Sequence, residues 1–226
     1  MAIEDDLNEA EQVEQLLGWW KENWAWLLSG IALGLLILIG WFWWTGNKES
    51  SAEQGGLLYR QLVAASDRND FGRMEALREQ IEKDYGSTPY ADQARLLVAR
   101  MYVETGEYAK AEALLGQVAA QARDEALRDI ALVRRARVLI QMDKADDALA
   151  LLKPDAAGAF TAIQQDVRGD AYHAKGDMEA ARTAYAQALE AEPALAPDER
   201  QVVELKLQDL AAEAGAPAAQ QESAAP

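Results

Sequence analysis

The feature that most constrains this chain is an uncharged apolar run over residues 24–44, WAWLLSGIALGLLILIGWFWW. As an α-helix this run would rise about 30 Å, the thickness of the hydrocarbon core of a bilayer. Tryptophans close both ends, and an indole ring with its single N–H group favours the headgroup layer. A buried core helix is the alternative, but core helices rarely run this long without a charge. The run therefore predicts a transmembrane helix whose interface anchors are Trp24, Trp26, Trp41, Trp43 and Trp44.

The residues before the run are acidic. Residues 1–23 hold seven Asp and Glu residues and a single basic residue, Lys21. A cleavable signal peptide starts with basic residues and has a shorter apolar stretch, so the pattern predicts a retained anchor behind a short acidic N-terminal segment. Apolar residues recur at three- and four-residue steps from Ile3 to Trp20. This spacing fits an amphipathic binding helix and a solvated tail equally well.

Composition excludes several classes of function. The 226 residues hold 22 Lys and Arg against 38 Asp and Glu, which gives a formal net charge of −16. An acidic surface repels phosphate backbones, so nucleic acid is not an expected partner. The chain contains no cysteine, which excludes disulfides, thiolate catalysis and lipid attachment through an N-terminal cysteine.

Turn-forming and polar residues divide the rest of the chain. Residues 45–56, TGNKESSAEQGG, are small and polar with three glycines, and they predict a linker. A helical domain is predicted over residues 57–214. Residues 215–226, GAPAAQQESAAP, have little apolar surface to bury and predict a disordered tail.

The ends of this predicted domain have recognisable helices. Two helices are expected at its start, over residues 57–65 and 71–85, and Asp92 is the expected N-cap of the next helix. Pro197 begins a last helix over residues 198–214, with apolar residues on one face and acids on the other. A helix of this kind is expected to cap a stack of repeats.

Three windows between residues 92 and 195 repeat one pattern of a small residue, a turn of Gly or Asp, and a second small residue. Small residues let the two helices of a hairpin approach closely. The second small residues are 37 and 33 positions apart, and the pattern resembles the tetratricopeptide repeat, a helix–turn–helix unit of about 34 residues. The fold class predicted is all-α: a single N-terminal transmembrane helix followed by a tetratricopeptide-like helical-hairpin solenoid. The two series are Ala99, Ala136 and Gly169, and Ala111, Ala148 and Ala181.

The copies differ in regularity. The third matches the repeat at nearly every marked position, and Pro193 ends it. The second is degenerate, because Lys153 and Pro154 interrupt its second helix early. For the first two copies, a generic array of helical hairpins remains the alternative.

No catalytic constellation is visible, so the chain is not expected to be an enzyme. Its one histidine, His173, is expected at the surface, and the sequence has no phosphate-binding glycine loop and no nucleophile elbow. One histidine and no thiol leave only scattered carboxylates, so neither a metal nor another cofactor is expected.

The resemblance to tetratricopeptide arrays implies a binding surface on a concave face, lined by the first helix of each hairpin. Much of this face is branched aliphatic, which suits an extended hydrophobic peptide or a partner's helix. The alternative is that several of these side chains pack against neighbouring helices. Transferred by repeat position, the candidate residues are Leu96, Arg100, Val103, Ile130, Val133, Arg137, Ile140, Ile163, Asp170 and His173.

Over nearly its whole length the chain resembles the YfgM family of Gram-negative bacteria, the ancillary subunit of the SecYEG translocon. The likeness rests on Gln12-Val13-Glu14, on Gly34 with Ile39-Gly40-Trp41, and on two runs of the third repeat, Asp166 to Asp170 and Lys175 to Arg182. It implies a single-pass inner-membrane protein with a cytoplasmic N-terminus and a periplasmic C-terminal domain. The count of basic residues near the span weakly favours the opposite orientation, because Lys21 precedes the span while Lys48 and Arg60 follow it. The resemblance outweighs so small a bias.

The same resemblance implies partners and a role. The partners are SecYEG, the periplasmic chaperone PpiD and unfolded or translocating polypeptides, with a cytoplasmic response regulator reached through the N-terminus. The role is to help pass newly translocated proteins to periplasmic chaperones. The alternative use of this architecture is a membrane-anchored tetratricopeptide scaffold in envelope assembly or cell division.

Overall fold

The computed structural model describes the backbone of residues 2–153 and 158–215, and the side chains of residues 13–42, 50–153 and 158–213. Within these ranges all regular secondary structure is helical. The chain separates into two compact units, residues 1–53 and residues 54–226. The predicted tail lies, from residue 216 on, outside the described residues.

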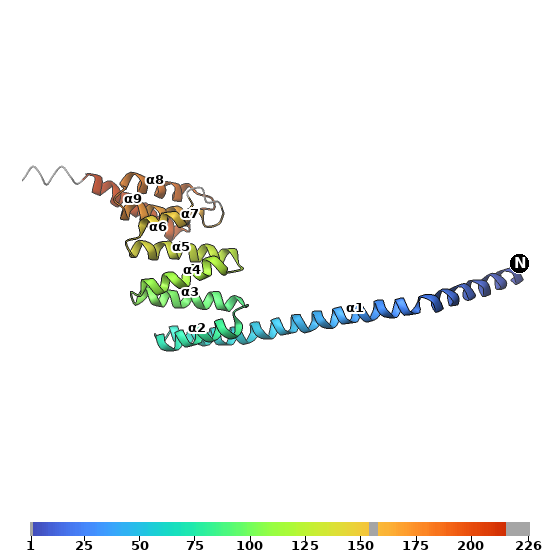
Figure 1. The fold of residues 1–226 in the computed structure, drawn as a ribbon. Helices are drawn as coiled ribbons and strands as arrows, with labels where there is room; N and C mark the ends of the chain where they lie inside the picture. Colours follow the sequence, from blue (N-terminus) through green and yellow to red (C-terminus); the bar gives the residue numbers. More distant parts are fainter. Residues whose placement is uncertain (1, 154–157, 216–226) are drawn as a thin grey trace, which may run out of the picture. The chain divides into compact units, whose positions relative to one another are not determined.

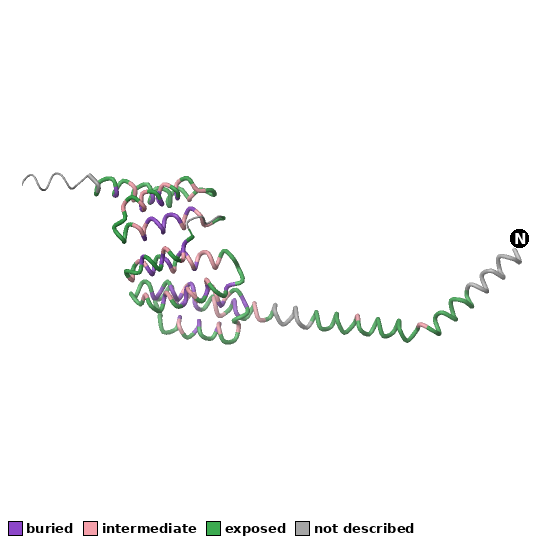
Figure 2. Tube along the Cα trace, turned by 45° about the horizontal axis from the view of Figure 1, so that its top comes forward, coloured by how far each residue is buried: buried purple, intermediate pink, exposed green. Residues whose placement is uncertain are grey.

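The first unit consists of the N-terminal part of helix α1 (Ala2–Ser66). Its stretch Val13–Phe42 is long and apolar enough to cross a membrane, with a mean hydropathy of 2.2 and no part of it buried. Figure 2 shows this part of α1 as almost entirely exposed. A helix whose described apolar side chains are exposed suits lipid and not a protein core, which disfavours the alternative of a buried core helix.

The predicted interface anchors fall in or beside this stretch. Trp24, Trp26 and Trp41 are 51%, 81% and 60% exposed, as residues that face lipid or headgroups should be. The side chains of Trp43 and Trp44 lie outside the described residues. Membrane contact by these five residues stays a prediction.

The predicted linker over residues 45–56 is helical in the structure, because α1 continues without interruption to Ser66. Two of its glycines have a packing role instead of a turn role. A Cβ atom on Gly56 would lie 3.0 Å from the ring of Tyr90, and one on Gly55 would lie 3.3 Å from Tyr85 Cβ. Glycine is therefore used here for the close approach of α1 to the end of α2 and the start of α3.

The second unit is a stack of antiparallel helices that contact their neighbours in order, as Figure 1 shows for α2 to α8. This arrangement confirms the predicted solenoid of helical hairpins. The end of α1 packs on α2, and three hairpins and a last helix follow. The helices are α2 (Phe71–Tyr85), α3 (Pro89–Glu104), α4 (Tyr108–Gln121), α5 (Glu125–Gln141), α6 (Ala145–Leu151), α7 (Thr161–Ala174), α8 (Met178–Glu190) and α9 (Pro197–Gly215).

The start of α3 differs from the prediction. The helix begins at Pro89 with Thr88 as the N-cap, so Asp92 lies in the first turn and is not a cap. Proline is favoured at the first helical position, where its missing N–H would have no partner anyway. Asp92 instead accepts a 2.9 Å hydrogen bond from Arg95.

The three hairpins share the predicted frame. Both series of small residues are buried. A Cβ atom on Gly169 would lie 2.3 Å from the ring of Tyr185, so only glycine fits at that position. The turns within the hairpins also follow the predicted pattern. At equivalent positions, Gly106, Asp143 and Gly176 have φ angles of 75°, 60° and 78°. These left-handed conformations explain the preference for Gly or Asp in each turn.

The second hairpin and the last helix depart from the regular repeat pattern. Helix α6 is only seven residues long and ends just before Lys153, as predicted. Helix α9 buries Val203 and Leu210, as a capping helix should, but Val202 and Leu205 are each 51% exposed. The apolar face of α9 is therefore only partly covered by the described residues of the stack.

Candidate functional site

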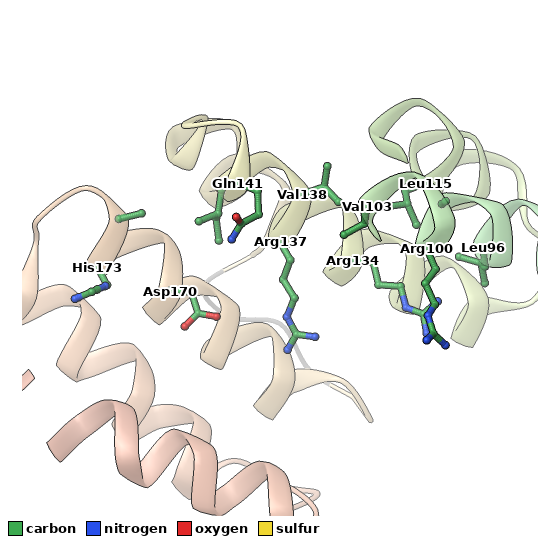
Figure 3. Close-up of a pocket in the computed structure, with 13 residues that line it drawn as sticks. Leu96, Arg100, Val103, Leu115, Arg134, Arg137, Val138, Gln141, Asp170 and His173 are labelled. Carbon is green, nitrogen blue, oxygen red and sulfur yellow. The ribbon is translucent and has the colours of Figure 1, made fainter. Parts of the chain in front are cut away.

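A pocket of the second unit lies across α3, α5 and α7, the first helices of the three hairpins. Its volume is about 600 Å³. Figure 3 shows side chains from these helices converging on it. The lining is formed by Leu96, Ala99, Arg100, Val103, Leu115, Arg134, Arg137, Val138, Ile140, Gln141, Asp170, His173 and Ala174.

Most of the candidate residues transferred from the repeat pattern line this pocket. They are Leu96, Arg100, Val103, Arg137, Ile140, Asp170 and His173. The other three are directed into the core: Ile130 packs on the first hydrophobic cluster, and Val133 and Ile163 belong to or pack on the second. Those three follow the alternative in which side chains of the first helices pack against their neighbours. Partner binding by the lining residues stays a prediction.

The lining is apolar at its floor and basic at its rim. Leu96 and Val138 are almost fully buried, while Val103 is 36% exposed at the opening. Arg100 donates a 2.7 Å hydrogen bond to Glu104 on its own helix. Arg137 reaches Asp166 on α7 at 3.4 Å. Two guanidinium groups thus already have carboxylate partners.

Arg134 is the important residue that sequence reasoning missed. Figure 3 shows its side chain near that of Arg100. Partial burial of its side chain, and then the guanidinium groups of Arg100 and Arg137, lower the pKa of Arg134, although the residue as a whole is exposed. Among the described residues it has no carboxylate partner. The spacing of Ile130, Arg134, Arg137 and Gln141 on one helical face is the signal that would have located it.

The α7 end of the pocket is acidic, but its charge is compensated. Lys206 on α9 donates 2.6 Å hydrogen bonds to both Asp166 and Asp170, and Tyr185 donates one of 2.8 Å to Asp170. Burial, and then the nearby Asp170, raise the pKa of Asp166, while Lys206 opposes the shift. His173 lies at the surface, as predicted, with Nε2 3.5 Å from Glu213.

The run from Asp166 to Asp170 has a structural explanation. Its two aspartates bind Lys206 of α9. Between them, Arg168 donates a 2.6 Å hydrogen bond to the carbonyl of Leu152, at the end of the short helix α6. Gly169 makes room for Tyr185. One five-residue segment therefore joins the second hairpin, the third hairpin and the last helix.

The lining of this pocket has the character of a binding surface. It offers an apolar floor, guanidinium donors and a few polar groups in place of a nucleophile with an adjacent base. Among the described side chains, no group of three or more His, Asp or Glu residues lies close enough to hold a metal ion.

The hairpin stack defines a tetratricopeptide-like helical domain, and residues 18–212 match the tetratricopeptide repeat-like domain family. The chain is 33% identical to the ancillary SecYEG translocon subunit of Escherichia coli (strain K12), over 90% of this chain and 97% of that relative. It is 30% identical to the protein of that name from Haemophilus influenzae, over 90% and 98%. The relative from Neisseria gonorrhoeae is 25% identical. The chain belongs to this family of ancillary translocon subunits, the YfgM family, as its resemblance implied.

Proposed function

We propose that this protein is a non-catalytic accessory subunit of the SecYEG translocon in the bacterial inner membrane, with its repeat domain in the periplasm. Its pocket binds segments of newly translocated polypeptides, and with the chaperone PpiD it passes them to periplasmic folding factors. Residues of the N-terminal segment contact a cytoplasmic response regulator. The relatives' name supports the translocon association, and the apolar helix supports the membrane location.

The observation that carries the client-binding part is the pocket across α3, α5 and α7. Its volume of about 600 Å³ accommodates a few side chains of an extended peptide. An apolar floor contributes burial energy, and polar groups at the rim orient the bound backbone. The domain is covalently joined to a helix suited to a membrane, which raises the concentration of the pocket near a membrane channel.

Site-specific photocrosslinking tests this function. Val103 lines the pocket and is 36% exposed, while Val202 on α9 is 51% exposed and does not line it. Each is replaced in turn by a photoreactive phenylalanine analogue, in cells that carry a secretory chain arrested in the translocon. We expect a crosslink to the arrested chain from position 103, and at most a weak one from position 202.

Two controls make this test decisive. A chain arrested before any segment has left the channel on the periplasmic side should give no crosslink at position 103. Equal yields from both positions, or crosslinks to the early-arrested chain, would contradict the proposal. Affinity purification in mild detergent should return SecYEG and PpiD; recovery of division or outer-membrane assembly proteins in their place would favour the scaffold alternative.

A further inference from the structure

The pocket has an excess of positive charge in a protein that is acidic overall. Its rim holds Arg100, Arg134 and Arg137, while the whole chain has a formal net charge of −16. Arginine stays protonated at any physiological pH, so these charges do not disappear when they are brought together. Their clustering costs free energy in the empty pocket, and a bound anion would remove that cost.

The carboxylates near the pocket do not fully offset this charge. Glu104 pairs with Arg100 in an exposed contact, which contributes little. Asp166 and Asp170 share Lys206, so only part of their charge is available to Arg137. Arg134 has no carboxylate partner among the described residues. The unmatched charge therefore lies between α3 and α5, beside the apolar floor.

We propose that the pocket selects polypeptide segments in which an acidic side chain is flanked by apolar residues, and that Arg134, with Arg100 and Arg137, binds the carboxylate. This specificity rests on the proposed function of client binding. Guanidinium groups bind carboxylates through paired N–H donors, so the contact is directional as well as charged. The flanking apolar residues cover Leu96 and Val103 on one side and Ile140 on the other.

The position of the charge favours an internal acidic residue over a chain end. Helix α5 lies between α3 and α7 in the stack, and it contributes two of the three arginines. Apolar lining continues from this basic centre toward both α3 and the end of α5. A chain terminus bound at the centre would leave one apolar side uncovered, whereas an internal glutamate or aspartate allows the segment to cover both.

Peptide binding to the full chain in lipid nanodiscs tests the proposal, with empty nanodiscs as the blank. The probes are short peptides with blocked ends, an uncharged fluorophore and leucines around one central residue, which is glutamate, glutamine or lysine. Fluorescence anisotropy should show the glutamate peptide binding roughly tenfold more tightly than the glutamine peptide, with the lysine peptide weakest. A fourth peptide, with central glutamine and a free C-terminal carboxylate, should bind like the blocked glutamine peptide.

Variants assign the preference to the pocket. Arg134→Gln should remove the preference for glutamate, while Arg134→Lys should keep part of it. Arg182→Gln, an equal change of charge on α8 outside the pocket, should leave the preference intact. Arg134 and Arg182 are both surface residues, and circular dichroism would verify that each variant is folded.

The outcomes distinguish a failure of this inference alone from a failure of client binding. Equal binding of the glutamate and glutamine peptides to the wild-type chain, or a preference that survives Arg134→Gln, overturns the inference and leaves client binding standing. Tighter binding of the peptide with a free C-terminus also overturns it, in favour of recognition of chain ends. If no peptide binds above the empty-nanodisc blank, the inference and client binding in this pocket both fail.

Discussion

The second and third hairpins have the same frame but differ in how they are completed. In the third, α7 and α8 pack closely because Gly169 admits the ring of Tyr185, and α9 adds Lys206 between Asp166 and Asp170. In the second, α6 stops after seven residues. The backbone carbonyl of Leu152 that follows it is bound by Arg168 of the third hairpin.

This difference shows that a degenerate repeat can depend on its neighbour for stability. The shared features of the frame, small residues and a left-handed turn, are present in both hairpins. What the second lacks is a full-length second helix, and a side chain from α7 supplies the missing contact. Substitutions in α7 should therefore affect both hairpins, whereas the reverse effect should be smaller.

The largest effect is expected from Gly169→Ala. A methyl group at this position would lie 2.3 Å from Tyr185, so α7 and α8 must separate or the ring must leave its site. We expect a loss of about 3 kcal/mol in the free energy of unfolding, the upper part of the range for an overpacked core. Urea unfolding followed by far-UV circular dichroism measures it.

The matched control is Gly72→Ala at the start of α2, where an added Cβ atom meets nothing within 4 Å. Its expected effect is neutral or stabilising by up to about 1 kcal/mol, because alanine favours the helix. Similar losses in the two variants would contradict the packing explanation for Gly169.

A smaller effect is expected from Arg168→Gln, which tests whether the second hairpin depends on the third. Losing a buried hydrogen bond from a charged donor should cost about 2 kcal/mol. Hydrogen exchange should rise in α6 and around Leu152, far from the altered side chain in sequence. If exchange rises only within α7 and α8, the dependence is refuted; Arg182→Gln serves as the exposed control.

The smallest effect concerns pH and the contact of α9 with α7. Burial and Asp170 raise the pKa of Asp166 above its usual value of 3.8, so the folded state holds this proton more tightly than the unfolded state. The contribution of Asp166 to the free energy of unfolding therefore increases as pH falls from neutral toward 3.8. Asp166→Asn removes this dependence.

Urea unfolding of both proteins at pH 7 and at pH 4, close to the usual value of 3.8, measures this contribution. Between these two values the wild type should gain stability relative to Asp166→Asn. A difference between the two proteins that is the same at both pH values would show that Asp166 does not titrate as its burial requires.

Sequence reasoning predicted those parts of the fold that depend on local chemistry. The small residues of each hairpin, the left-handed turn residues and the early end of α6 follow from steric limits that act within a few residues. The helical conformation of residues 45–56 could not be predicted from their glycines, because the reason for Gly56 is Tyr90, a residue that meets it only in the folded domain. Asp92 was likewise displaced as a cap by the preference of Pro89 for the first helical turn.

For the candidate site, repeat position identified the helices that line the pocket and most of the residues. It could not separate Ile140, which packs on the second cluster and also lines the pocket, from Val133, which is buried in that cluster, because both are branched apolar residues on one helix. It also missed Arg134, whose importance depends on the absence of a nearby carboxylate among the described residues. Which side chains line a pocket, and which charges have partners, can be determined only once several helices are placed together.

The walls of the pocket belong to three different hairpins, and in a repeat array each unit touches mainly its neighbours. A rotation of a few degrees at one junction is therefore not resisted by contacts further along and changes the spacing of the walls directly. The stiffness of the junctions between hairpins then determines both how far the array bends and how tightly the pocket can hold a bound segment. Under the proposed function, any force or partner that flexes the stack would regulate capture and release without touching the bound segment.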